Sequence, residues 1–334
     1  MHDNDQVIKP ACPAGKVVFG PVPSRRLGLS LGIDIVPHKV CSYDCIYCEV
    51  GTTTLKTLSR QSYLPEDEII EEIKCFFSKN QNPMDFVTFS GSGEPTLHLG
   101  LGRLIQTVKA MTTTTIAVLT NGSLLADALV RQDLSFADVV LPSLDTVRAS
   151  TFEQLNNPAP GLRIGDVVQG LNKFVESFSG RCWVEVLLVK GINDSPVEIE
   201  GLTDALAWIA PEKVQLTTAY RPSRTACVEP VDLESLTRIA QKMRSRVNVE
   251  IVGSFSTSRH IEGLENTEHR IAAMLRIRPM TFEELMLATG LKAAELNKIL
   301  SFLDQGGAIA EIRFKDKDFF TLKIRTGDND HAHP

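Results

Sequence analysis

The feature of this chain that most constrains its fold is a regular alternation of short apolar segments with longer amphipathic ones. Apolar runs of strand length lie at 31–36, 86–90, 116–120, 139–141, 183–189, 214–217 and 249–252. Apolar residues recur at helical spacing near 64–77, 101–111, 123–131, 165–178, 197–209 and 232–245. Strands and helices in alternation are typical of a parallel sheet covered by its helices. The pattern predicts an α/β fold, a partial (β/α)6 TIM-type barrel over residues 19–253.

Polar and glycine residues gather where these predicted strands end. Active sites of such barrels lie at the carboxyl ends of the strands, where the loops converge on one face. Glycine lets a backbone approach a ligand closely, although each of these residue types is also common in turns and helix caps. We therefore expect one site formed by Gly91, Gly93, Glu94, Asn121, Ser143, Asp145 and Asn193.

Three arginines are candidate contacts for an anionic substrate. Arg25 and Arg26 precede the first predicted barrel strand, and Arg221 follows the sixth. Arginine recognises carboxylate and phosphate groups through two parallel hydrogen bonds. The alternative for each of the three is a solvated surface side chain.

Three thiols within eight residues follow the first predicted barrel strand. They are Cys41, Cys45 and Cys48, and Tyr47 stands directly before the last of them. Thiolates favour zinc or iron–sulfur clusters. A closed structural zinc site needs four protein ligands, so three cysteines indicate a centre with one open coordination position. The competing interpretation is a zinc site completed by His38.

Composition limits the classes of protein that remain. The 334 residues are 43% hydrophobic and 23% charged, and no run of about 18 apolar residues predicts a membrane span. The first residues lack the pattern of a signal peptide, so we expect a cytoplasmic protein whose thiols bind metals or stay free. The net charge of −6 gives no overall attraction to nucleic acid, so binding of nucleic acid would need a local basic patch. Four cysteines are scattered singly, and each is expected to be an ordinary small side chain, buried or at the surface: Cys12, Cys75, Cys182 and Cys227.

A second, smaller unit is predicted after the barrel. Residues 254–266 have the composition of a linker, and residues 267–325 contain three helical patterns followed by two strand-like segments. This order predicts a winged helix-turn-helix domain, with Gly290 in the turn. The predicted recognition helix carries little positive charge, which favours docking of a partner or substrate over reading duplex DNA. The two ends, residues 1–18 and 326–334, are predicted to be a mobile arm and a disordered tail.

The thiol loop, its aromatic residue and its place after the first barrel strand resemble the signature of the radical S-adenosylmethionine (SAM) superfamily. The resemblance implies that Cys41, Cys45 and Cys48 hold three irons of one [4Fe-4S] cluster, with SAM chelating the fourth. It further implies reductive cleavage of SAM to a 5'-deoxyadenosyl radical, which abstracts hydrogen from a substrate. A one-electron donor such as flavodoxin or ferredoxin is the implied partner.

The resemblance also implies roles for the residues at the strand ends. Residues 91–95 resemble the superfamily's glycine–glycine–glutamate element, so Glu94 is expected to meet the SAM ammonium group. Ser143 and Asp145 resemble its ribose-binding pair, and Asn193 falls in a fifth-strand motif near the adenine. The full set expected to contact SAM is Tyr47, Gly91, Gly93, Glu94, Asn121, Ser143, Asp145 and Asn193.

Within the superfamily, residues 19–51 and 86–97 resemble the branch that contains wybutosine-tRNA synthase and many uncharacterised relatives. That tRNA enzyme holds a second cluster on cysteines upstream of its core, where this chain has only Cys12, so a single cluster is expected. The principal hypothesis is a radical enzyme acting on an unidentified substrate, which is an RNA or a protein or peptide docked by the winged helix. The two alternatives are a dedicated tRNA-modifying enzyme and an iron–sulfur redox regulator acting through the winged helix.

Overall fold

Parallel strands dominate the computed structural model, which describes residues 16–80, 83–225, 228–252 and 267–323. One sheet contains eight strands in the order β1-β2-β5-β6-β7-β8-β9-β10, and every neighbouring pair after β1–β2 is parallel. The strands are β1 Val18–Ser24, β2 Gly28–Ile33, β5 Phe86–Phe89, β6 Thr115–Thr120, β7 Val139–Pro142, β8 Arg181–Leu188, β9 Lys213–Thr218 and β10 Val249–Ile251. Spatial order follows sequence order, as in a barrel. The predicted α/β fold with a partial barrel is confirmed.

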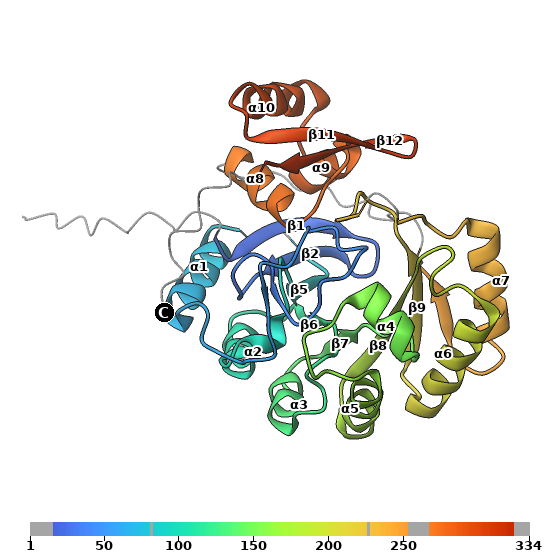
Figure 1. The fold of residues 1–334 in the computed structure, drawn as a ribbon. Helices are drawn as coiled ribbons and strands as arrows, with labels where there is room; N and C mark the ends of the chain where they lie inside the picture. Colours follow the sequence, from blue (N-terminus) through green and yellow to red (C-terminus); the bar gives the residue numbers. More distant parts are fainter. Residues whose placement is uncertain (1–15, 81–82, 226–227, 253–266, 324–334) are drawn as a thin grey trace, which may run out of the picture.

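Helices cover the outer face of this sheet (Figure 1). They are α1 Glu66–Lys79, α2 Leu101–Lys109, α3 Ala128–Leu134, α5 Ile164–Ser177, α6 Pro196–Ile209 and α7 Leu233–Met243. Apolar stripes of these helices pack on outward-facing strand residues such as Val184 and Val214 in one continuous core. Two further helices, the 3-10 helix η1 Pro95–Leu97 and α4 Ala149–Asn156, lie in connections that the sequence pattern does not predict as helical.

The segment before the first predicted strand differs from the prediction. The prolines and glycines in residues 19–28 predict an irregular loop, but the structure has strand β1 there, paired antiparallel with β2. The register shifts between Phe19 and Val22. Pro21 and Pro23 lack N–H groups, which a strand at the end of the sheet tolerates because it has a partner on only one side.

The predicted mobile arm is also shorter than expected at its carboxyl end. Val17 and Val18 are buried, and their backbone N–H groups donate to Oε1 of Glu72 at 3.0 and 2.8 Å. The buried Glu72 carboxylate of α1 therefore fixes the start of β1. Residues 1–15 lie outside the described residues.

Three helices and a hairpin, here called the carboxyl-terminal unit (residues 267–323), pack on β1. Its elements are α8 Thr267–Ile277, α9 Phe282–Thr289, α10 Ala293–Gln305, β11 Ile309–Phe314 and β12 Lys317–Leu322. Figure 1 shows the unit lying over β1. The buried core of the unit includes Phe19 and Val22 of β1. Gly290 ends α9 at a φ of 70°, a conformation that glycine adopts readily. The predicted linker 254–266 and tail 326–334 lie outside the described residues.

The scattered cysteines and the membrane prediction have separate outcomes. Cys182 is buried in the barrel core, whereas Cys75 is disulfide-bonded, contrary to the expectation that it stays single. Whether a cysteine forms a disulfide depends on tertiary geometry that spacing in the sequence does not reveal. Cys12 and Cys227 lie outside the described residues. Among the residues with described structure, no helix has the length and apolar character needed to cross a membrane.

Candidate active site

The thiol loop (residues 41–48) crosses the carboxyl ends of β5, β6 and β7. It leaves the short strand β3 Val40–Cys41, which pairs in parallel with β4 Leu55–Lys56. The Glu94 N–H after β5 donates to the Val40 carbonyl at 3.0 Å, and the Asp44 N–H donates to the Asn156 carbonyl at 3.0 Å. The loop is therefore held by backbone hydrogen bonds to the regions that follow β5 and β7.

Each thiol of the loop has its own N–H donor. Lys39 Nζ lies 3.0 Å from Cys48 Sγ. Asn121 Nδ2 lies 3.5 Å from Cys41 Sγ, and Asn156 Nδ2 lies 3.5 Å from Cys45 Sγ. All three thiols are free and half-buried. Such donors stabilise negative charge on sulfur, so this set fits the thiolate ligands of an iron–sulfur cluster.

Burial disfavours the anionic form of these thiols in the protein alone. It raises the pKa of Cys41 to about 12 and raises the pKa of Cys45 well above its ordinary value.

Within the described ranges, no group of three or more His, Cys, Asp or Glu side chains is arranged to hold a single metal ion. Burial, together with the charges of Arg276 and Lys39, lowers the pKa of His38, the fourth ligand of the competing zinc interpretation.

Glu94 is a buried anchor between β5 and β6. Its Oε1 accepts hydrogen bonds from Thr96 N at 3.0 Å, from Thr96 Oγ1 at 2.6 Å and from Thr120 Oγ1 at 2.6 Å. Its Oε2 accepts from Asn121 N at 2.7 Å. The residue is only 2% exposed, and burial raises the pKa of its carboxyl group. Glu94 is thus satisfied by protein donors rather than turned toward an open site.

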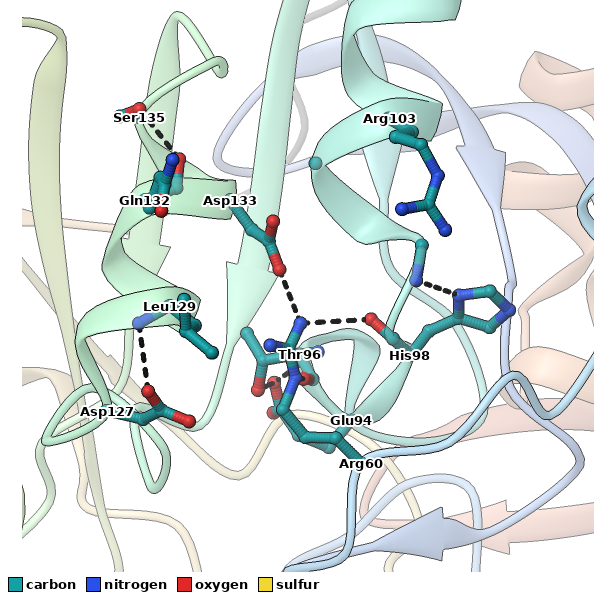
Figure 2. Close-up of polar contacts among 12 residues, drawn as sticks. Arg60, Glu94, Thr96, His98, Arg103, Asp127, Leu129, Gln132, Asp133 and Ser135 are labelled. Carbon is teal, nitrogen blue, oxygen red and sulfur yellow. Dashed lines mark hydrogen bonds and ion pairs between the residues drawn. The ribbon is translucent and has the colours of Figure 1, made fainter.

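Arg60 binds the backbone of the η1 segment that directly follows Glu94. Figure 2 shows its guanidinium between Asp133, with which it forms an ion pair, and the His98 carbonyl. Its Nε donates to the Thr96 carbonyl at 2.9 Å. Arg60 follows the thiol loop in sequence, so it ties the segment after the loop to η1 and α3.

The glycines before Glu94 allow close packing of protein on protein. A Cβ at Gly91 would lie 2.3 Å from Cγ of Asp34, and one at Gly93 would lie 2.2 Å from the Val40 carbonyl oxygen. The space that a side chain would occupy at these two glycines is thus filled by other parts of the protein. The two glycines let the β5 end approach the end of β2 and the start of the thiol loop.

Tyr47, Asp145 and Asn156 form a hydrogen-bonded group beside Cys45. Tyr47 Oη donates to Asp145 Oδ2 at 2.5 Å, and Asn156 Nδ2 donates to the same oxygen at 3.0 Å. Asp145 Oδ1 accepts from Leu187 N at 2.9 Å. Burial raises the pKa of Asp145 to about 6. Two residues of the predicted set, Tyr47 and Asp145, are thus in direct contact, and Asn156 joins them as a residue that was not predicted.

The other residues predicted from the strand ends have separate surroundings. Asn121 places its side chain on the thiol loop, where it also donates to Ser42 Oγ at 2.8 Å. Ser143 is half-buried at the end of β7, in a backbone bridge with Glu185. Asn193 is fully buried and links Asp145 O, Leu187 O and Val189 N at 2.9, 2.8 and 2.7 Å.

The three predicted anion contacts lie on the side of the barrel toward β1. The Arg25 guanidinium lies 4.2 Å above the ring centroid of Tyr220. Arg26 forms an ion pair with Glu185. Arg221 is 3% exposed, with Nη1 at 3.4 Å from Glu49 Oε2 and Nη2 at 2.7 Å from Glu284 Oε1.

Four residues that were not predicted from the sequence help to form the site: Lys39, Glu49, Asn156 and Glu284. A lysine two positions before the first thiol is the one signal in the local sequence. Asn156 and Glu284 come from segments far away in the chain, and only the fold brings them to the loop.

Comparisons with known proteins agree with this site. Residues 35–200 match the radical SAM superfamily. The chain is 37% identical over 297 residues to a protein of Brachyspira hyodysenteriae named GTPase Obg, covering 89% of this chain and 44% of that protein. The chain thus spans less than half of that relative. It is also 37% identical over 210 residues to a UPF0026 protein of Helicobacter pylori, covering 62% of this chain and 67% of that protein.

The fold has a counterpart among solved structures. The crystal structure of Streptococcus suis SuiB bound to precursor peptide SuiA superposes with a TM-score of 0.51 at 16% identity, covering 71% of this chain and 54% of SuiB. At this identity the likeness concerns the fold alone. The superfamily match implies SAM-dependent radical chemistry, with an iron–sulfur cluster and SAM as cofactors. With the thiol loop at the strand ends and the UPF0026 relative, it follows that the chain belongs to the radical SAM superfamily of enzymes, among its UPF0026 proteins.

Proposed function

We propose that this enzyme holds one [4Fe-4S] cluster on Cys41, Cys45 and Cys48 and uses it to cleave SAM reductively. The observation that carries the proposal is the set of three free thiols, each with its own N–H donor. When bound, the cluster supplies the electron that breaks a C–S bond of SAM and yields the 5'-deoxyadenosyl radical for hydrogen abstraction from substrate. A small one-electron donor such as flavodoxin or ferredoxin is the proposed reductant, acting in a reducing cytoplasm.

The proposed SAM site lies at the ends of β5 to β8, beside the thiol loop. Ser143 is half-buried there, which supports direct contact between its hydroxyl and the ribose. Tyr47 and Asn121 are also half-buried and approach the same space from the thiol loop and from β6. We propose that the other members of the set shape the site by fixing the loops around it: the buried Glu94, Asp145 and Asn193 and the closely packed Gly91 and Gly93.

We propose that the substrate approaches from the side of β1 and the carboxyl-terminal unit. Arg25 and Arg26 are half-buried there, and Arg26 has a carboxylate partner, Glu185. A guanidinium has five donors, so both arginines suit an anionic group of the substrate. Arg221 is bound by two carboxylates, which supports a role in joining elements instead.

The carboxyl-terminal unit is proposed to be a winged helix that docks a protein or peptide. Phe302 on α10 and Ile312 on β11 are 63% and 38% exposed. The charges of the hairpin are balanced, since Arg313 Nη1 lies 2.7 Å from Asp318 Oδ1. Nucleic-acid binding depends mainly on uncompensated positive charge, so this surface suits a polypeptide better than RNA or DNA.

Anaerobic reconstitution of the full chain tests the proposal. Wild-type protein should bind about four irons and, with dithionite, convert SAM to 5'-deoxyadenosine. Cys45→Ala should lose the cluster and SAM cleavage while its circular dichroism spectrum stays that of the wild type, because the thiol lies on a loop outside the barrel sheet. Cys182→Ala, at a thiol buried in the barrel core, is the matched control and should keep the cluster. Zinc in place of iron, or iron without SAM cleavage, would refute the proposal.

A further inference from the structure

Lys39 is a buried cation whose side chain contacts a thiol of the loop. The residue is 3% exposed, and its Nζ lies 3.0 Å from Cys48 Sγ. Within the part of the chain that the structure describes, no carboxylate forms an ion pair with Lys39. Burying an ammonium group is costly unless an anion compensates its charge. The arrangement therefore calls for negative charge at Cys48, which a metal-bound thiolate supplies.

The backbone of Lys39 is held in an unfavourable conformation. Its φ is 58°, in the left-handed region that is uncommon for residues other than glycine, asparagine and aspartate. Its N–H donates to the Ser92 carbonyl at 3.1 Å, and its own carbonyl accepts from Thr54 N at 3.0 Å. Strain of this kind persists only where surrounding contacts fix it, and it concentrates at functional sites. The backbone contacts to Ser92 and Thr54 thus hold Lys39 in the conformation from which its side chain contacts Cys48.

The three N–H groups that donate hydrogen bonds to the cysteine sulfurs differ in charge and distance. Asn121 and Asn156 are neutral amides at 3.5 Å from Cys41 and Cys45, whereas Lys39 is a cation at the shorter distance of 3.0 Å. Charge-assisted hydrogen bonds are stronger than neutral ones. The electrostatic effect on the three ligands is therefore concentrated at Cys48.

We propose that Lys39 is a positioning residue that raises the reduction potential of the cluster through its hydrogen bond to Cys48. This inference rests on the proposed function, because it requires a cluster on the three thiols. Reduction adds one negative charge to the cluster, and a cation in contact with a ligand stabilises the reduced form more than the oxidised form. Hydrogen bonds and charge around the sulfurs are known determinants of cluster potential. Lys39 would thus bring the cluster within reach of a one-electron donor.

The test compares Lys39→Met with Lys56→Met in anaerobically reconstituted protein. Lys56 is a half-buried lysine of the neighbouring strand β4, and its Nζ contacts Asn157 Oδ1 at 2.9 Å instead of a thiol. Both variants lose one positive charge near the loop, but only Lys39→Met loses the contact to sulfur. At a fixed ambient potential, Lys39→Met should show at least a tenfold lower ratio of reduced to oxidised cluster. For a one-electron couple this corresponds to about 59 mV, and Lys56→Met should change the ratio much less.

The readout is a redox titration followed by electron paramagnetic resonance, with iron content measured on each sample. Lys39→Arg keeps a cationic donor and should restore most of the potential. Lys39→Gly should have the same low reduction potential as Lys39→Met. Its free energy of unfolding should be higher than that of Lys39→Met, because glycine adopts positive φ without strain. These two variants separate the electrostatic role of the side chain from any effect on folding.

The outcomes also separate this inference from the proposed function. If wild-type protein assembles a cluster and Lys39→Met has the same potential and spectrum, the inference is wrong while the function stands. Equal shifts in Lys39→Met and Lys56→Met would likewise overturn it, since a general field would then explain both. If the wild type assembles no cluster, the proposed function itself fails.

Discussion

The carboxyl group of Asp34 is buried directly beneath the glycine segment at the end of β5. It is 4% exposed, and its Oδ2 accepts hydrogen bonds from Ser92 N at 3.1 Å and from Ser92 Oγ at 2.7 Å. Burial raises its pKa from 3.8 to about 6, because desolvation outweighs these hydrogen bonds. This single residue therefore couples the packing beneath the site to pH.

The stability of the fold should depend on pH through Asp34. Its pKa is higher in the folded than in the unfolded state, so its contribution to stability is complete below about pH 4. It is lost as the pH rises through about 6. Asp34→Asn keeps an oxygen acceptor for Ser92 but cannot ionise. From pH 4 to pH 7, the wild type should lose about 2 kcal/mol of unfolding free energy relative to this variant.

Urea unfolding at pH 4, 5, 6 and 7 measures this difference. Asp127→Asn is the control, because Asp127 is an exposed cap of α3 and asparagine caps helices equally well. A difference between Asp34→Asn and wild type that stays constant from pH 4 to pH 7 would contradict the prediction.

At the scale of residues, the sequence predicts what lies close in the chain and misses what tertiary contacts create. Cys41, Cys45 and Cys48 are predictable because their chemistry and spacing are local. Glu94 is found from its glycine motif, but its burial and four protein donors depend on Thr120 and Asn121 from the next strand. Asn156 lies 111 positions from Cys45 in the chain, so no local pattern points to it.

At the scale of elements, the segment that follows β5 packs on β3 at Gly93. This contact yields a prediction. A Cβ at Gly93 would meet the Val40 carbonyl oxygen at 2.2 Å, and that oxygen belongs to backbone that cannot rotate away. Gly93→Ala should lower the free energy of unfolding by about 1–3 kcal/mol, as overpacking usually does. It should also lower the iron content after reconstitution, because Val40 directly precedes Cys41.

Thermal unfolding and iron analysis of the same samples test this prediction. Gly165→Ala is the matched control: nothing lies within 4 Å of its added Cβ, and Gly165 is in α5. Alanine there should be neutral or stabilise the protein by up to about 1 kcal/mol, since it favours helix. Unchanged iron content in Gly93→Ala would show that the glycine does not position the thiol loop.

The elements themselves were predictable to different degrees. Strands such as β6 and β8 are continuous apolar runs bounded by turn residues, which makes them visible in the sequence. β1 was not, since its prolines oppose strand formation and only its pairing with β2 and its cover by the carboxyl-terminal unit make it a strand. The short helix α4 was missed because it is an addition to the regular strand–helix alternation.

On the scale of the whole molecule, the carboxyl-terminal unit is fixed to the barrel by apolar packing and by arginines. Its core shares Phe19 and Val22 with β1. Arg276 Nη2 and Arg278 Nη2 donate to the carbonyls of Lys16 at 2.7 Å and Pro23 at 2.8 Å. The unit therefore covers the edge strand of the sheet, where unpaired backbone would otherwise invite association with other chains. The sequence predicts a second unit but not this shared core, because β1 appears there as a loop.

Arg221 extends this attachment to the thiol loop. Its guanidinium binds Glu284 of α9 and Glu49, the residue directly after Cys48. Glu284 also belongs to the capping box of α9 with Thr281. One buried arginine thus connects the carboxyl-terminal unit, the end of β9 and the loop that carries the thiols. A partner docked on the unit has through this residue a physical route to the proposed cluster site.

Glu284→Gln tests that connection, because glutamine preserves the capping box while removing the charge that pairs with Arg221. Loss of one partner from a buried ion pair costs about 3–5 kcal/mol, and the retained hydrogen bond should place this variant at the low end. Amide hydrogen exchange should increase both in α9 and in residues 41–49. Glu283→Gln, at the exposed neighbouring position, removes the same charge without contact to Arg221 and should leave both regions unchanged. Faster exchange confined to α9 would mean that Arg221 does not couple the unit to the thiol loop.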